Sequence, residues 1–229
     1  MNRCLRLLTV LSVMAPCLSL ADSPPIDPHA DLLYRQALPF LEQADTQAST
    51  FSPPTDATQD DLLRQGTTLV QTLTPGVELL RKAASLNHPV AEYRLALYYM
   101  TYLSPAEVPA QACPLLAASL SQGFAPASLQ INSLCSEYRD SDAYRAALKK
   151  AVQDATRYAT YYPQPAMRLE CRPQGRRGLT LQWGQQRDFQ AEVYRLLGAV
   201  DRPQRQMWYR KAVDANGCAT AQHRLTSQR

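Results

Sequence analysis

The cysteines are the residues whose type and spacing most plainly permit chemistry. The chain has 6 cysteines, and an even set in an exported protein is typical of disulfides. Metal binding is the alternative, but there is no Cys-x-x-Cys spacing and the 3 histidines are scattered. We therefore expect two bridges, with three connectivities open, among the cysteines that lie beyond the first 21 residues: Cys113, Cys135, Cys171 and Cys218.

Oxidised cysteines require export, which the first residues predict. Arg3 and Arg6 form a basic start, and a mostly apolar stretch runs from 7 to 20. This stretch is short for a membrane anchor and contains Pro16, which also disfavours a lipoprotein signal at Cys17. We expect a signal peptide cleaved after about Ala21, a periplasmic or secreted location, and a single domain over 22–229.

Composition and charge exclude several classes of function. The chain is 45% hydrophobic and 19% charged, as in globular domains. Its formal net charge of +4 falls to +2 without the leader, which is too small to indicate nucleic-acid binding. No other run approaches a membrane span, so we expect no integral membrane segment after cleavage.

Catalytic motifs are missing from the sequence. No Ser is followed three residues later by Lys, and Gly-x-Ser-x-Gly, His-Glu-x-x-His and a phosphate-binding glycine-rich loop are absent. We therefore expect no enzymatic activity, no catalytic residue, no metal and no cofactor.

Helical periodicity dominates the rest of the chain. It predicts helices over 29–44, 59–73 and 140–162, with a polar loop over 45–58 and a break at Pro75 after the second helix. The stretch 167–183 alternates with period two, which allows a short β-hairpin or an irregular loop. Four apolar residues of the second predicted helix are expected to face inward: Leu62, Leu63, Val70 and Leu73.

The stretch 76–100 predicts two helices folded against each other, because Pro89 interrupts the first and can open the second. A second copy lies at a constant offset of 36 residues, which aligns Asn87 with Gly123 and Leu80 with Leu116. A third copy lies near the C-terminus. The recognisable units span about 76–102, 112–138 and 189–226.

These units resemble the Sel-one-like repeat family, a relative of the tetratricopeptide repeats. KAASLNHPVAEYRLALYY (82–99) carries the pattern, with Asn87 in place of the usual Gly. The second unit keeps Gly123 but has Ala118 for the expected Lys, and the last keeps RKA and AQHRL. The usual Gly-containing loop after each second helix is absent. The resemblance implies an all-α fold, an α/α solenoid of helical hairpins whose concave surface holds partners.

The resemblance also implies functions. Members usually act as adaptors or scaffolds. Some exported, disulfide-bonded bacterial members are associated with penicillin-type ligands, and others are periplasmic immunity proteins that capture toxic effectors such as phospholipases. We expect a non-catalytic periplasmic module that binds another protein, as an adaptor or immunity protein. The alternatives are a cysteine-rich penicillin-binding or β-lactamase-like repeat protein and a cell-envelope assembly factor.

The helical hairpin favours one pairing of the cysteines. Cys113 and Cys135 lie at neighbouring ends of the second unit, and Cys171 would then pair with Cys218. His88 in the inter-helix turn is expected to pack rather than to catalyse. The residues that we expect to contact a partner are Tyr98, Tyr99, Tyr102, Tyr158, Tyr161, Tyr162, Arg176 and Arg177. The alternative is packing inside the solenoid for the tyrosines and a solvated basic loop for the two arginines.

Overall fold

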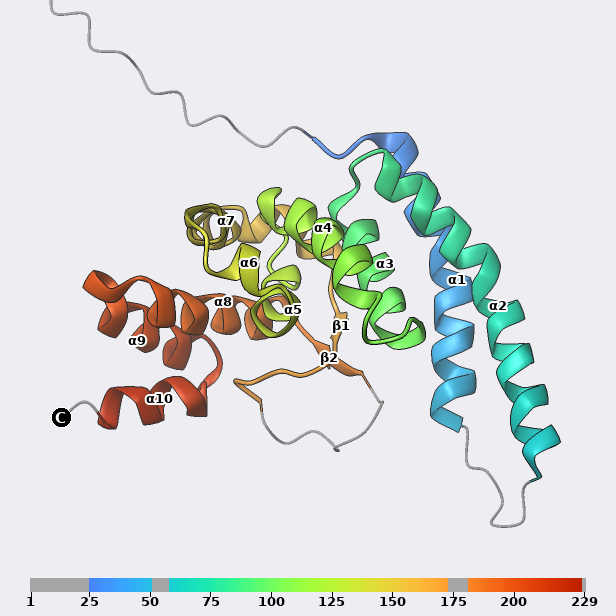
Figure 1. Ribbon diagram of the computed structural model, residues 1–229. Helices are drawn as coiled ribbons and strands as arrows, with labels where there is room; N and C mark the ends of the chain where they lie inside the picture. Colours follow the sequence, from blue (N-terminus) through green and yellow to red (C-terminus); the bar gives the residue numbers. More distant parts are fainter. Residues whose placement is uncertain (1–24, 51–57, 173–180, 228–229) are drawn as a thin grey trace, which may run out of the picture.

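A computed structural model describes residues 25–50, 58–172 and 181–227. The predicted leader, Arg176 and Arg177 lie outside the described residues. Within them the fold is mostly helical, with a two-stranded sheet (Figure 1). The elements are α1 (Pro28–Thr50), α2 (Gln59–Ser85), α3 (Pro89–Tyr102), α4 (Val108–Ser121), α5 (Ala127–Leu134), α6 (Ser136–Arg139), α7 (Asp142–Gln153), η1 (Ala155–Tyr161), β1 (Gln164–Ala166), β2 (Gln182–Gly184), α8 (Gln186–Val200), η2 (Arg202–Gln204), α9 (Arg205–Asn216) and α10 (Ala219–Thr226).

Helices α1 and α2 are longer than predicted and form a hairpin at one edge of the molecule (Figure 1). Both continue through a proline, Pro39 in α1 and Pro75 in α2, although proline removes a helical hydrogen bond. At Gly76 the two helices cross so closely that an added Cβ would lie 2.9 Å from Cβ of Phe40. Packing along α1 therefore overrides the expected break at Pro75.

The prediction that four residues of α2 face inward is wrong for three of them. Leu62, Leu63 and Val70 are exposed, and only Leu73 is buried. The buried residues of α2 begin at Leu73 and continue toward α3, whereas the N-terminal half of α2 runs alongside α1 (Figure 1). Sequence periodicity identified an apolar face but could not show how far the neighbouring helices reach.

The two aligned hairpins have matching backbone turns and matching buried positions. Asn87 and Gly123 both have positive φ, at 59° and 92°, a conformation that asparagine and glycine tolerate best. Leu80 and its aligned residue Leu116 are both fully buried. In each case a left-handed residue ends the first helix and lets the chain reverse into the second.

The single helix predicted over 140–162 is two elements. Helix α7 ends at Gln153, and the tighter 3-10 helix η1 comes next. This change of direction allows the Tyr158 hydroxyl to donate to the carbonyl of Gln122 at 2.7 Å. After η1 the chain returns to the first helices, where Gln164 Nε2 donates to Tyr34 Oη of α1 at 3.3 Å.

An antiparallel strand pair is present near the predicted β-hairpin, but its strands are displaced from the alternating residues. Strands β1 and β2 have three residues each and pair Gln164 with Gly184 and Ala166 with Gln182. Leu169 and Cys171 come after β1 and are buried outside the strands. The alternation therefore indicated the location of the hairpin without its register.

Both favoured disulfides are confirmed. Cys113 within α4 pairs with Cys135 at the C-terminal end of α5. Cys171 pairs with Cys218, which fixes the segment after β1 to the start of α10. Among the described residues, none of the helices combines the length and apolar character needed to cross a bilayer.

Candidate protein-binding surface

Helix α3 provides the centre of the candidate site. Pro89 opens the helix, and His88 Nδ1 caps it by accepting from the Ala91 amide at 3.2 Å. Every residue from Pro89 to Leu97 is buried. Only the last turns reach the surface, so any contact that α3 makes with a partner must come from them.

Three side chains lie along one face of α3 at helical spacing. Arg94, Tyr98 and Tyr102 succeed one another at intervals of four residues, which places them on the same side of the helix. The rings of Tyr98 and Tyr102 lie 5.0 Å apart between centroids. Arg94 is 9% exposed, whereas Tyr102 is 44% exposed, so this face runs from the interior to solvent.

Residues from two other elements complete this face. Trp183 of β2 places its ring 5.4 Å from Cζ of Arg94 and is 45% exposed. Asp45 of α1 lies 3.9 Å from Arg94, measured between Oδ2 and Nη2. We call Asp45, Arg94, Tyr98, Tyr102 and Trp183 the aromatic surface. It joins α1, α3 and β2 around one nearly buried guanidinium.

The charges of the aromatic surface are partly desolvated. Burial raises the pKa of the Asp45 carboxyl, and the positive charge of Arg94 opposes that rise. Burial also raises the pKa of the Tyr102 hydroxyl, with a further contribution from the negative charge of Asp45. A partner would therefore meet two half-exposed aromatic rings beside a charge pair that has already lost much of its water.

The tyrosines predicted as partner contacts fall into two groups. Tyr98, Tyr99 and Tyr102 gather at the end of α3, where Arg81 Nε lies 3.4 Å from Tyr99 Oη. Tyr158 is 1% exposed, so its prediction as a surface contact is wrong for this fold. Its ring packs on Phe124, with centroids 5.3 Å apart.

Tyr161 and Tyr162 are half-buried and pack against the chain itself. Tyr161 donates to Asp31 Oδ1 at 2.8 Å, which connects η1 to α1. The Tyr162 ring lies between those of Phe124 and Phe189, 6.2 and 5.8 Å from their centroids. Both tyrosines therefore hold η1 against its neighbours.

His88 is the residue most suggestive of catalysis, because an acid and a tyrosine lie near it. Its Nε2 is 3.5 Å from Asp31 Oδ1, and its ring stacks on Tyr34 at 4.8 Å. The side chain is fully buried, and Nδ1 already accepts from Ala91. Burial lowers the pKa of His88, which favours the neutral ring that this cap requires. The arrangement fixes α1 to the turn between α2 and α3.

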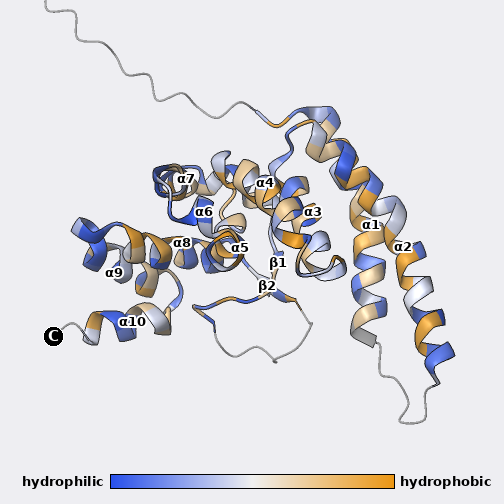
Figure 2. Cartoon of the chain, in the orientation of Figure 1, coloured by the Kyte–Doolittle hydropathy of each residue, from blue (hydrophilic) through white to orange (hydrophobic). Residues whose placement is uncertain are grey.

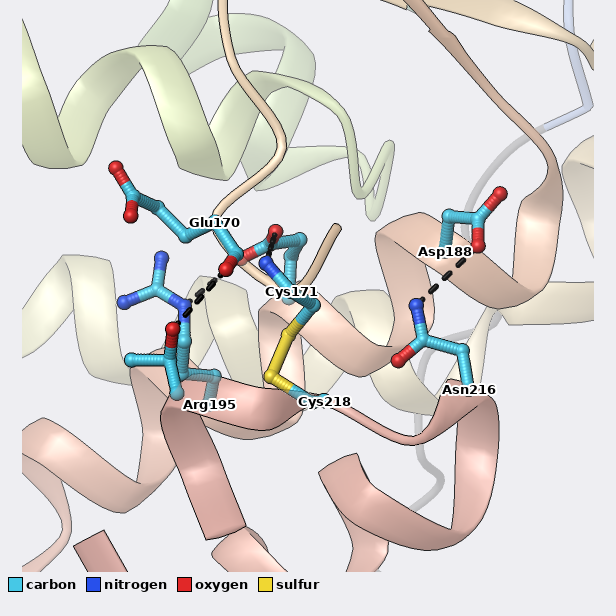
Figure 3. Close-up of a disulfide and its surroundings, with 8 residues drawn as sticks. Glu170, Cys171, Asp188, Arg195, Asn216 and Cys218 are labelled. Carbon is cyan, nitrogen blue, oxygen red and sulfur yellow. Dashed lines mark hydrogen bonds and ion pairs between the residues drawn. A yellow bond between two sulfur atoms is a disulfide. The ribbon is translucent and has the colours of Figure 1, made fainter. Parts of the chain in front are cut away.

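A second polar cluster surrounds the Cys171–Cys218 bridge (Figure 3). Glu192 is fully buried and accepts from the Cys171 amide at 2.5 Å and from Arg195 Nε at 2.8 Å. Asp188 accepts from Asn216 Nδ2 at 3.2 Å. These carboxylates satisfy backbone and side-chain donors around the bridge, so their evident role is to hold α8, α9 and the segment after β1 together.

Two hollows in the described part of the chain differ greatly in size. A pocket beside Tyr158 and Tyr162 has a volume of about 10 Å³, enough for roughly one water molecule. An open groove of about 750 Å³ lies between α7 and the end of α8. There Lys149 pairs with Asp201 at 3.2 Å, which neutralises part of the groove's positive charge.

Comparisons with known proteins do not extend these observations. No protein-family model matches the chain, and neither the curated proteins nor the solved structures give a match.

Sequence reasoning missed Arg94, Trp183 and Asp45. Arg94 could have been found, because Arg94, Tyr98 and Tyr102 are spaced four residues apart along one predicted helix. Trp183 and Asp45 lie far from α3 in the sequence, and their approach depends on how β2 and α1 pack.

Proposed function

We propose that this protein is a non-catalytic, exported interaction module that binds another protein through the aromatic surface. The observation that carries the proposal is the Trp183 ring over Arg94, with Tyr98 and Tyr102 following Arg94 along the same face of α3. Tryptophan, tyrosine and arginine dominate the energetics of protein interfaces, especially where charge is already desolvated. Such a surface suits a folded protein partner better than a small metabolite.

We further propose that the helices form a short α/α solenoid of the Sel-one-like type. Left-handed residues at Asn87, Gly123 and Gly217 separate successive helices, and matching positions such as Leu80 and Leu116 are buried alike. Each hairpin in such a stack buries its apolar faces only against its neighbours. The stack then serves as a rigid base for the aromatic surface.

The partner class that we propose is a secreted or periplasmic protein, such as a toxic phospholipase effector neutralised by an immunity protein. Support comes from the predicted leader and from two disulfides, which persist in oxidising compartments. An adaptor role for an envelope protein uses the same surface. The identity of the captured protein distinguishes these roles.

Affinity capture with matched variants tests the proposal. Tagged protein is incubated with periplasmic extract under oxidising conditions, and retained proteins are identified by mass spectrometry. We expect one discrete partner with the wild type and with Met207→Ala, which alters a similarly exposed residue on α9. We expect its loss with Tyr102→Ala and Trp183→Ala. Equal recovery by all four proteins would contradict the assignment of this surface.

A further inference from the structure

The N-terminal half of α2 carries an apolar face that no other described element covers. Leu63 is 61% exposed and Val70 is 54% exposed, one heptad apart on the same side of the helix. The stretch from 65 to 77 contains no charged residue, which is unusual for a helix at the edge of a fold. Figure 2 shows hydrophobic residues along this part of α2.

The polar residues of this stretch turn their hydroxyls into the helix. Thr67 donates to the carbonyl of Leu63 at 2.8 Å, and Thr74 donates to that of Val70 at 2.8 Å. Thr68 and Thr72 do the same to the carbonyls four residues earlier, each at 3.0 Å. Because these hydroxyls already donate to backbone carbonyls, the threonines require no hydrogen-bond acceptor from a neighbouring molecule.

Gly66 lies between Leu63 and Val70, and no contact among the described residues requires a glycine there. A Cβ added there would meet nothing within 4 Å. Glycine inside a helix costs about 1 kcal/mol relative to alanine, so a residue with a side chain would stabilise α2 alone. The missing side chain does allow the backbone of another helix to approach closely between Leu63 and Val70, as small residues do at helix contacts.

The distribution of charge indicates what covers this face. The nearest charges are Asp60, Asp61 and Arg64, and Arg64 pairs with Asp61 at 2.9 Å. An acidic start disfavours an anionic membrane surface, which attracts Lys and Arg. The uncharged stretch offers a charged partner nothing to pair with. It can pack against another uncharged apolar helix, and α2 of a second copy of this chain is such a helix.

We propose that two copies of this chain associate through α2, packed antiparallel with the two-fold axis near Gly66. This pairing places Leu63 of each copy against Val70 of the other, and lays the backbones together at Gly66. It also sets Asp60 and Asp61 opposite the uncharged residues near Leu73. A parallel pairing would bring the acidic residues of the two copies together, so the antiparallel arrangement is favoured.

Analytical ultracentrifugation of the full exported protein tests the proposal. We expect a reversible dimer for the wild type and for Leu32→Asp, which changes a residue 52% exposed on α1. We expect a folded monomer for Val70→Asp, with circular dichroism and the melting temperature close to those of the wild type. A wild type that stays monomeric at all concentrations, or a Val70→Asp protein that stays dimeric, would overturn the proposal.

Cysteine cross-linking tests the geometry of the dimer. Gly66→Cys places two thiols beside the two-fold axis, so mild oxidation should give a covalent dimer, while Leu32→Cys should remain monomeric on a non-reducing gel. A covalent dimer in neither variant, or in both equally, would overturn the antiparallel arrangement. Because α2 is separate from the aromatic surface, Val70→Asp should still capture the proposed partner. If Val70→Asp fails to capture the partner and the wild type is monomeric, the partner rather than a second copy covers α2.

Discussion

The indole ring of Trp183 lies over the guanidinium of Arg94, with 5.4 Å between the ring centroid and Cζ. This contact joins β2 to α3 and places the ring at the buried end of the face that carries Tyr98 and Tyr102. Arg94 is 9% exposed and Trp183 is 45% exposed. The nearly buried guanidinium therefore contacts the indole ring, while much of the indole remains accessible to solvent.

Replacing Trp183 should separate binding from stability. Trp183→Ala removes a half-exposed ring, so we expect little change in the free energy of unfolding. Binding of the captured partner should weaken by about 2 kcal/mol or more, as for aromatic hot spots. Calorimetry with the purified partner and urea unfolding of the variant measure the two effects. A large loss of stability with unchanged affinity would show that the contact only holds β2 in place.

Removing the Tyr93 hydroxyl should destabilise the fold. Tyr93 is fully buried, and its hydroxyl donates to the carbonyl of Pro165 in β1. Tyr93→Phe leaves that buried carbonyl unpaired, which costs about 1–3 kcal/mol. Urea unfolding should show this loss, with a smaller effect for Tyr98→Phe, which lies closer to the surface. Equal effects of the two substitutions would contradict the importance of this bond.

Glu92 should make stability depend on pH. Burial raises its pKa to about 7, and donation from Gln122 Nε2 opposes the rise. Between pH 4.5 and 7 the folded state therefore binds more protons than the unfolded state, so this contribution to stability falls as pH rises. Glu92→Gln removes it. The variant should match the wild type at acidic pH and exceed it by up to about 3 kcal/mol above neutrality.

Urea unfolding across this pH range measures the effect, with Glu78→Gln on the exposed side of α2 as the control. A constant difference between the Glu92→Gln variant and the wild type at every pH would show that Glu92 does not titrate in this window.

The two disulfides should contribute unequally. The Cys113–Cys135 bridge joins residues 22 apart, and the Cys171–Cys218 bridge joins residues 47 apart. Loop entropy predicts losses of about 3 and about 4 kcal/mol when each pair is replaced by serine. Urea unfolding of the two paired variants tests this order. A larger loss for the shorter loop would show that packing around Cys113 outweighs the entropy of the unfolded chain.

Local features could be predicted from the sequence. The pairing of Cys113 with Cys135 followed from the antiparallel hairpin. The constant offset of 36 residues aligned Asn87 with Gly123, and both residues have a left-handed backbone in the structure. Long-range features could not. Nothing near Leu63 and Val70 shows that their side chains are left exposed beside α1, and nothing near Trp183 places it over Arg94.

Site-specific photocrosslinking from position 102 in cells tests the central claim most directly. A photoreactive phenylalanine replaces Tyr102 in one variant and Met207 in another, and adducts are identified after irradiation. We predict a discrete adduct with one exported or periplasmic protein from position 102, and none from position 207. No adduct from position 102, or the same adducts from both positions, would contradict binding through the aromatic surface.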